Sequence, residues 1–288
     1  MRIDGSDMNT WTRQAVILLA SSAVLLLSNV LAQDEDDRAN QAGEKEQRSA
    51  YLQAMQAMAA ECKVVRSTDH GEVLCTMTKE SVLNWADSAR HPDLLVPGTC
   101  WIWHDEGRPQ AIGEIYGRAD AVGFWNMFNC SLSSDKLRFT SESRDWLATA
   151  SYYEPKAIPN STVAKSKAER TFQLKQLARR FDAHQFWDGE RYELRLLSQP
   201  LYRYDDQRAG IIDGAIYALV HGTNPEVLLL IEAHQTGEGV EQWKVAFGSL
   251  AGARCVVRLD REERWSCVLH DGDPADPRQG FYREVLVK

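Results

Sequence analysis

Two tryptophans and a histidine lie within one short segment, and their types and spacing suit ligand binding. Trp101 and Trp103 alternate along the chain, so on a strand both indoles point to the same face. Alternating aromatic side chains on a sheet can bind a sugar or a peptide, although they also commonly form the buried face of a strand. We predict Trp101, Trp103 and His104 as ligand-binding residues, with burial in the core as the alternative interpretation.

The histidines and serines follow no catalytic pattern that can be recognised from spacing alone. None of the seven histidines lies in an H-x-x-x-H or H-E-x-x-H pattern, and the sequence has no G-x-S-x-G elbow, P-loop or G-x-G-x-x-G motif. We therefore predict no catalytic residue and no cofactor. A hydrolase with a site assembled from distant loops stays open, because convergent sites leave no linear trace. That alternative requires His104, Asp105 and Glu106 to meet another polar group in a cleft.

Two acidic runs could offer oxygen ligands to a cation. Residues 34–37 are all acidic, and the run from His270 to Pro277 contains three aspartates and a glycine. The second run lacks the spacing and the closing glutamate of an EF-hand. A solvated tail and a surface loop, respectively, explain the two runs, so we predict no metal site.

The chain has six cysteines, an even number, and they follow no zinc-ligand spacing. Cys62 and Cys75 flank a turn at residues 69–71, and Cys255 and Cys267 flank a turn at residues 260–263. In an exported chain an even number of cysteines favours disulfides, and a local bridge across each of these turns is possible. The remaining pair, Cys100 and Cys130, is expected on strands separated by a third strand, beyond the reach of a bridge, and so as buried thiols unless the sheet closes.

These candidates are positioned by two halves of the chain that have the same order of elements. Helical apolar spacing over residues 46–61 (Leu52, Met55, Met58) and over residues 161–186 (Phe172, Leu174, Leu177, Phe181) predicts one helix at the start of each half. Short strands with turns between them follow each helix. Such short connections leave no room for crossover helices, so the strands must pair antiparallel.

Local markers recur in the two halves at nearly constant offsets. The segment from Gly98 to Gly117 aligns with the segment from Gly214 to Ala233, and Pro109 aligns with Pro225. A tryptophan-led strand follows each segment, at Trp125 and at Trp243. We predict a tandem duplication of an α+β unit in which one helix packs on an antiparallel sheet of about five to six strands. The apolar run at residues 228–231 predicts a strand buried on both faces, against the other unit.

The segment from Gly107 to Gly117 with the following Trp125, and the segment from Asp213 to Ala233, carry a resemblance to a known group of proteins. They look like a family of uncharacterised secreted proteins from planctomycete-type bacteria. The resemblance covers most of residues 98–265, and its motifs are turn glycines, a turn proline and strand apolars. It implies export and no established activity, so it assigns no functional residue.

The N-terminus has the features of a secretory signal. The apolar stretch from Ala15 to Leu27 follows Arg13 and is short for a membrane span. Small residues Val30 and Ala32 predict cleavage after residue 32. An uncleaved anchor and a start at Met8 instead of Met1 stay open. The sequence predicts no further membrane span, and localisation in the periplasm or outside the cell.

Net charge and chain length limit the possible partners and the domain organisation. The chain has 288 residues and a formal net charge of -8, with no basic stripe, which argues against nucleic acid as the partner. We predict a signal peptide at 1–32, an acidic disordered linker at 33–45, a first unit at 46–150, a linker at 151–162 and a second unit at 163–288. The predicted function is a non-catalytic exported protein that binds an unknown ligand or an envelope protein. A hydrolase and a structural envelope protein are the alternatives.

Overall fold

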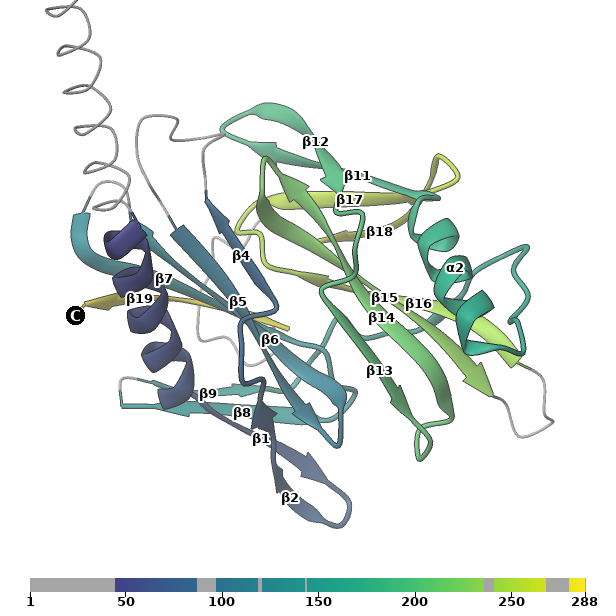
Figure 1. Cartoon of the computed structure of the whole chain (residues 1–288), viewed down its shortest axis with the longest axis horizontal. Helices are drawn as coiled ribbons and strands as arrows, with labels where there is room; N and C mark the ends of the chain where they lie inside the picture. Colours follow the sequence, from purple (N-terminus) through teal and green to yellow (C-terminus); the bar gives the residue numbers. More distant parts are fainter. Residues whose placement is uncertain are drawn as a thin grey trace, which may run out of the picture. The chain divides into compact units, whose positions relative to one another are not determined.

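The computed structural model describes residues 45–86, 97–118, 121–142, 144–235, 241–267 and 280–287. Antiparallel strands make up most of this part of the chain, and two helices accompany them (Figure 1). Every strand pair among the described residues is antiparallel, which confirms the prediction from the short connections. The predicted signal peptide and most of the acidic linker lie outside the described residues.

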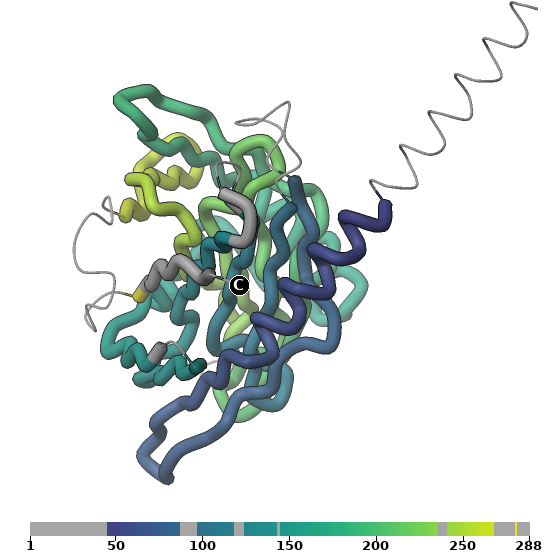
Figure 2. Tube along the Cα trace, turned by 90° about the vertical axis from the view of Figure 1, so that its left-hand side faces the viewer, coloured from purple at the N-terminus to yellow at the C-terminus, as the bar shows by residue number. Residues whose placement is uncertain are grey.

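The first helix spans residues 45–61, as the apolar spacing predicts. Met55 and Met58 are buried, so the predicted stripe faces the interior. A four-stranded sheet follows in the order β2-β1-β8-β9. Its strands are β1 (Lys63–Thr68), β2 (Gly71–Leu74), β8 (Lys136–Ser141) and β9 (Arg144–Ala148). The β1–β2 hairpin projects beyond the other strands of this sheet (Figure 2).

The remaining strands of the first half form a second sheet together with β19, which comes from the C-terminal end of the chain. Its order is β19-β7-β6-β5-β3, and β4 also pairs with β5. Its strands are β3 (Thr76–Met77), β4 (Leu83–Ala86), β5 (Pro97–Asp105), β6 (Arg108–Arg118), β7 (Ala121–Ser131) and β19 (Phe281–Val287). The last strand of the chain, β19, therefore covers the edge of β7, which sequence reasoning did not predict.

The second half forms one nine-stranded sheet around the helix α2 (Lys167–Ala178). The order is β10-β16-β15-β14-β12-β11-β17-β18, with β13 also on β14. The strands are β10 (Lys156–Ala157), β11 (Phe181–Trp187), β12 (Glu190–Leu196), β13 (Tyr202–Asp206), β14 (Ile211–His221), β15 (Asn224–Gln235), β16 (Glu241–Ser249), β17 (Arg254–Leu259) and β18 (Glu262–Cys267).

The prediction of a helix over residues 161–186 is wrong at both ends. The helix begins after Ser166, whose hydroxyl accepts a hydrogen bond from the Glu169 N–H at 3.2 Å and donates one to the Glu169 carboxylate. Ser166 therefore caps the N-terminus of the helix by satisfying one of its free backbone N–H groups. After residue 180 the chain is strand β11, which pairs with β12 and β17. Those two ladders outweigh the helical spacing of Phe181, and Phe172 of the predicted stripe is 62% exposed.

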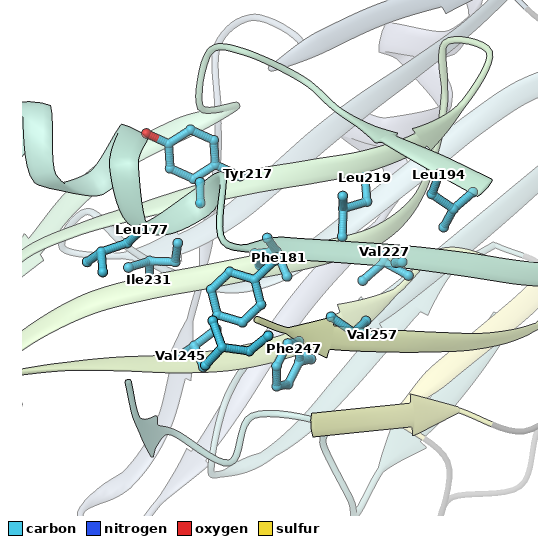
Figure 3. Packing of buried hydrophobic residues seen from close by; sticks show 14 of the residues in the cluster. Leu177, Phe181, Leu194, Tyr217, Leu219, Val227, Ile231, Val245, Phe247 and Val257 are labelled. Carbon is cyan, nitrogen blue, oxygen red and sulfur yellow. The ribbon is translucent and has the colours of Figure 1, made fainter. Parts of the chain in front are cut away.

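Two hydrophobic cores lie on the two faces of strands β14–β16. One core contains Leu229 and Ile231 and packs against α2, as Figure 3 shows for Ile231 and Leu177. The other contains Leu228 and Leu230 and joins these strands to β5–β7 of the first half. The prediction that residues 228–231 are buried on both faces, against the other half, is confirmed.

The two halves pair their strands in matching order. The order β2-β1-β8-β9 in the first half corresponds to β12-β11-β17-β18 in the second. The order β4-β5-β6-β7 likewise corresponds to β13-β14-β15-β16. The second half joins its strands into one sheet, whereas the first divides them between two sheets.

Candidate functional site

The two predicted ligand-binding indoles share the helix-facing side of β5, together with Thr99. The Trp103 side chain is 1% exposed, and its Nε1 donates a hydrogen bond to the Cys62 carbonyl at 3.1 Å. Its ring also covers Gly113, where a Cβ would lie 2.7 Å from the indole. Because Trp103 is enclosed on every side, its position fits the core interpretation of the strand.

His104 stabilises a turn. Its Nδ1 accepts a hydrogen bond from the Gly107 N–H at 3.2 Å, and its ring stacks on Tyr202 with 6.4 Å between centroids. The neighbouring Asp105 accepts from Arg66 at 2.6 Å and from Arg208 at 3.4 Å. The polar groups that meet this predicted cluster are therefore arginines: Arg66 connects the β5–β6 turn to β1 of the first half, and Arg208 connects it to the second half.

Trp101 forms part of a pocket, unlike Trp103. The pocket encloses about 270 Å³ between the first helix, the loop before β4 and strand β5. We call it the Trp101 pocket. Its lining residues are Leu52, Gln56, Lys79, Glu80, Ser81, Asn84, Thr99 and Trp101. A pocket of this size is smaller than the roughly 300–1,000 Å³ of sites for drug-sized ligands, so it suits one small polar group.

Hydrogen bonds fix the side chains at the floor of the Trp101 pocket, whereas polar groups at its rim remain available to a ligand. Thr99 Oγ1 accepts a hydrogen bond from Trp101 Nε1 at 3.0 Å and donates to Met55 Sδ at 3.5 Å. At the rim, Asn84 Oδ1 accepts from Ser81 Oγ at 2.7 Å, which leaves the Asn84 amide N–H groups for a ligand. The side chain of Gln56 is exposed and has no hydrogen-bond partner in the described part of the chain. Two carboxamides and an indole therefore converge on one cavity.

A buried polar cluster joins the two halves, and sequence reasoning missed it. Glu232 on β15 is 1% exposed and accepts hydrogen bonds from Tyr153 Oη at 2.7 Å and Tyr204 Oη at 2.8 Å. His234 Nε2 lies 2.7 Å from the same carboxylate, and Arg108 Nη2 of the first half lies 3.9 Å away. The Arg108 guanidinium also covers the Tyr153 ring at 4.5 Å from its centroid. We call these five residues the Glu232 cluster.

The pKa values in the Glu232 cluster follow from this geometry. Burial alone would raise the pKa of Glu232, but the His234 hydrogen bond, the Arg108 charge and the Tyr153 hydrogen bond together hold it below its ordinary value. The pKa values of the Tyr153 and Tyr204 hydroxyls are raised, first by burial and then by the Glu232 charge. The Glu232 carboxylate is thus ionised, and the other residues of the cluster satisfy its lone pairs. We interpret the cluster as a structural contact that holds the two halves together.

Both predicted disulfides are wrong, since all six cysteines are buried free thiols. Cys75 donates its backbone N–H to the Val64 carbonyl, so it lies opposite Val64 and is offset from Cys62. Cys255 and Cys267 are opposite each other in the β17–β18 register, as the hairpin predicts. Their thiols donate instead to the Ala253 carbonyl and to Ser249 Oγ, each at 3.7 Å. The expectation of buried thiols at Cys100 and Cys130 is confirmed.

We expect a thiol reagent at pH 8 to label none of the six cysteines in the folded protein and all six after denaturation without reductant. All six thiols are buried, which keeps the reagent from them. Burial also raises the pKa of Cys75 to about 11 and that of Cys130 to about 12, so their reactive thiolate forms are scarce. A hydrogen bond with Cys255 lowers the pKa of Cys267, so the protection of Cys267 comes from its burial. Mass spectrometry of the labelled chain counts the modified thiols. Four or fewer labels in the denatured chain would instead indicate a bridge.

The described residues contain no group of three or more histidines, cysteines or acids that could hold a metal ion. The acidic run at residues 34–37 and the run from His270 to Pro277 both lie outside the described residues. In the part of the chain that is described, no helix is both long and apolar enough to cross a membrane.

Comparison with known proteins identifies no relative. No protein-family model matches the chain, and neither the curated proteins nor the solved structures contain a match. The Trp101 pocket and the Glu232 cluster are therefore interpreted from their own chemistry.

Proposed function

We propose that this chain is an exported, non-catalytic binding protein that holds its ligand in the Trp101 pocket. The convergence of the Gln56 and Asn84 carboxamides over the Trp101 indole supports this proposal. Each carboxamide offers a donor and an acceptor, and the Trp101 indole, which is 3% exposed, lies beneath them. Such a pocket recognises a small polar group without needing a reactive residue.

The unpaired charges at the rim agree with recognition of a neutral or zwitterionic group. Lys79 and Glu80 line the same pocket, and neither side chain has an ion-pair partner among the described residues. Their opposite charges leave the rim without net charge. A ligand with strong net charge of either sign would meet one repulsive group.

We also propose that the two halves arose by duplication of one α+β unit. Their matching strand orders support this, and so does a shared local contact. Gly98 pairs with Trp85, and Gly214 pairs with Tyr204. In each pair the aromatic ring covers the glycine, where a Cβ would lie 2.2 Å and 2.8 Å from the ring, respectively. An experimental structure in which the halves fail to superpose strand for strand would contradict the duplication.

Export to the periplasm or the cell exterior is part of the proposed function. It is supported by the apolar segment from Ala15 to Leu27, which follows Arg13 and precedes small residues suited to cleavage. Mass spectrometry of the protein recovered from its native envelope tests export, because cleavage would place Gln33 at the N-terminus. An intact Met1 or Met8 on protein from the cytoplasm would contradict it.

The ligand site is tested by thermal unfolding against sugars, amino acids, peptides, lipids and divalent metals. A ligand at about 100 times its Kd adds roughly 2.7 kcal/mol of stability, which raises the Tm by several degrees at roughly 2–4 °C per kcal/mol. We expect at least one class to raise the Tm of the wild type. The Gln56→Ala/Asn84→Ala double variant should lose most of that rise, because it removes both carboxamides.

The matched control is Gln53→Ala, which changes an exposed glutamine of the same helix that does not line the pocket. It should retain the full ligand-induced rise in Tm. A rise that survives in the double variant would place the ligand elsewhere, and a flat panel would remove the support for a small-ligand binding protein.

A further inference from the structure

The chain between β3 and β4 forms a bulge beside strand β5. Two paired segments, 76–77 and 83–86, flank this bulge, and the five residues 78–82 between them lie opposite only two residues of β5. The backbone N–H groups of Thr78 and Val82 donate to carbonyls of β5, each at 2.8 Å, so both ends of the bulge are fixed. The extra residues therefore stand out from the sheet at a defined place.

The bulge brings two opposite charges to the Trp101 pocket. In a regular strand, successive side chains point to opposite faces. The chain bends at Lys79 and Glu80, however, and both side chains line the pocket. Both are exposed, and neither has an ion-pair partner in the part of the chain that the structure describes. The rim therefore presents one cation and one anion that this part of the protein leaves unpaired.

Asn84 of β4 presents hydrogen-bond donors to the same pocket. It pairs with Thr99 of β5, so the two side chains lie on the face of the sheet that carries Trp101. Asn84 Oδ1 accepts a hydrogen bond from Ser81 Oγ at 2.7 Å. Because this bond occupies the oxygen, Asn84 offers a ligand mainly its amide N–H groups.

The floor of the pocket adds no further polar group for a ligand. Trp101 is 3% exposed and Thr99 is 0% exposed. The Trp101 Nε1 donor is bonded to Thr99 Oγ1 at 3.0 Å, and Thr99 Oγ1 donates to Met55 Sδ at 3.5 Å. Selectivity must therefore come from the polar and charged side chains of the rim.

The rim groups fall into two sets of opposite character. Lys79 and Asn84 offer donors that suit a carboxylate, whereas Glu80 and the side-chain carbonyl of Gln56 offer acceptors that suit an ammonium group. A neutral ligand would leave both charges without a counter-charge. A singly charged ligand would satisfy one charge and be repelled by the other. A ligand that carries both charges close together satisfies all four groups.

We propose that the Trp101 pocket binds a free α-amino acid, with the ligand carboxylate at Lys79 and Asn84 and the ligand ammonium group at Glu80 and Gln56. An α-amino acid carries both charged groups on one carbon atom, so both sets of rim groups can be satisfied within a cavity of about 270 Å³. This inference rests on the proposed function, because it names the ligand class of the same pocket.

A longer peptide fits these observations less well. Its ammonium group and its carboxylate lie at opposite ends of the chain, so a single small pocket cannot hold both. An extended peptide would instead pair with an edge strand such as β9 or β2, which has a strand neighbour on one side only among the described residues. Neither of these strands lines the Trp101 pocket, so the two modes of binding can be separated by substitution.

The test is isothermal titration of the purified full chain with L-leucine, L-serine and L-glutamine. Each amino acid is compared with its amide, which keeps only the ammonium group, its N-acetyl derivative, which keeps only the carboxylate, and its neutral N-acetyl amide. We expect at least one free amino acid to bind with a stoichiometry of one. Removal of either charge should raise the Kd roughly threefold or more, as expected for an ion pair that stays partly exposed to water.

Two variants assign each end of the ligand to a residue. Lys79→Met should weaken binding of the amino acid and remove its advantage over the amide, because the variant has no cation for the carboxylate. Glu80→Gln should instead remove the advantage over the N-acetyl derivative. The control is Lys63→Met, which changes an exposed lysine of β1 that does not line the pocket, and it should keep the wild-type Kd.

The possible failures of the two proposals differ. A neutral derivative or another ligand class that binds through Gln56 and Asn84, while no free amino acid is preferred, would overturn the amino-acid inference and leave the proposed function standing. Amino-acid binding that is unchanged in both Lys79→Met and Glu80→Gln would also overturn the inference. Binding of amino acids or peptides that is unchanged in the Gln56→Ala/Asn84→Ala variant would place the ligand elsewhere and overturn both proposals.

Discussion

Replacing Glu232 with leucine is expected to lower the free energy of unfolding by about 3–5 kcal/mol at pH 7, as found when one partner of a buried ion pair is removed. Glu232 is the common acceptor of the cluster that joins the halves. Without it, the Arg108 charge stays buried and the Tyr153 and Tyr204 hydroxyls lose their acceptor. Urea unfolding followed by circular dichroism measures the change.

The pH dependence of this effect has a definite sign. The pKa of Glu232 is lowered in the folded state, so its ionised form is favoured by folding. Its contribution to stability is fully present above about pH 4.3, the unfolded value, and is lost as the pH falls through the folded pKa. The stability difference between wild type and Glu232→Leu should therefore be constant near neutrality and shrink below about pH 4.

Two further variants separate this mechanism from simple damage to the core. The double variant Arg108→Leu/Glu232→Leu should recover part of the lost stability, because it leaves no buried charge uncompensated. Glu193→Gln changes a carboxylate that is exposed on β12, and it should stay within about 0.5 kcal/mol of wild type. A Glu232→Leu protein as stable as wild type would show that the Glu232 cluster does not stabilise the contact between the two halves.

The sequence contained the local features of this fold. Turn glycines and the alternation of strand residues depend on neighbours along the chain. Together with the matched markers of the two halves, they predicted the hairpins correctly. The apolar run at residues 228–231 likewise predicted that both faces of strand β15 are buried. Such features can be predicted from the sequence because local backbone geometry restricts them.

Features that distant segments form together could not be predicted from the sequence. Glu232 draws its partners from the first half, the linker and β13, and no spacing in the sequence connects Arg108, Tyr153 and Tyr204. The signal of a buried cluster was an acidic residue directly after the apolar run at residues 227–231 of β15. The strand β19 pairs with β7 over a separation of about half the chain, which local patterns equally cannot reveal.

The error at residues 181–186 has the same origin. Phe181 continues the helical spacing of Leu174 and Leu177, and helix propensity is a weak preference that tertiary pairing overrides. Here β11 gains a partner on each side, β12 and β17. The Trp101 pocket depends on the same long-range packing, so sequence reasoning found Trp101 through its alternation with Trp103 but not Gln56 or Asn84.

The two indoles of β5, which the sequence grouped together, should respond differently to substitution and ligand. Trp103→Ala is expected to lower the free energy of unfolding by about 3–5 kcal/mol, the usual cost of truncating a buried tryptophan. The ring is 1% exposed and packs on Gly113, and its N–H bond to the Cys62 carbonyl is lost as well. Urea unfolding measures this change against Trp187→Ala, whose indole is 46% exposed and whose loss should cost less than about 1 kcal/mol.

The same variant tests the ligand-binding prediction for Trp103. If Trp103 acts only through the core, the part of the Trp103→Ala protein that stays folded should bind the ligand of the Trp101 pocket with a nearly unchanged Kd. Loss of affinity with little loss of stability would instead make Trp103 a contact residue. Two adjacent positions on one strand face thus separate a residue that supports the sheet from one that lines the cavity, since only Trp101 reaches the pocket.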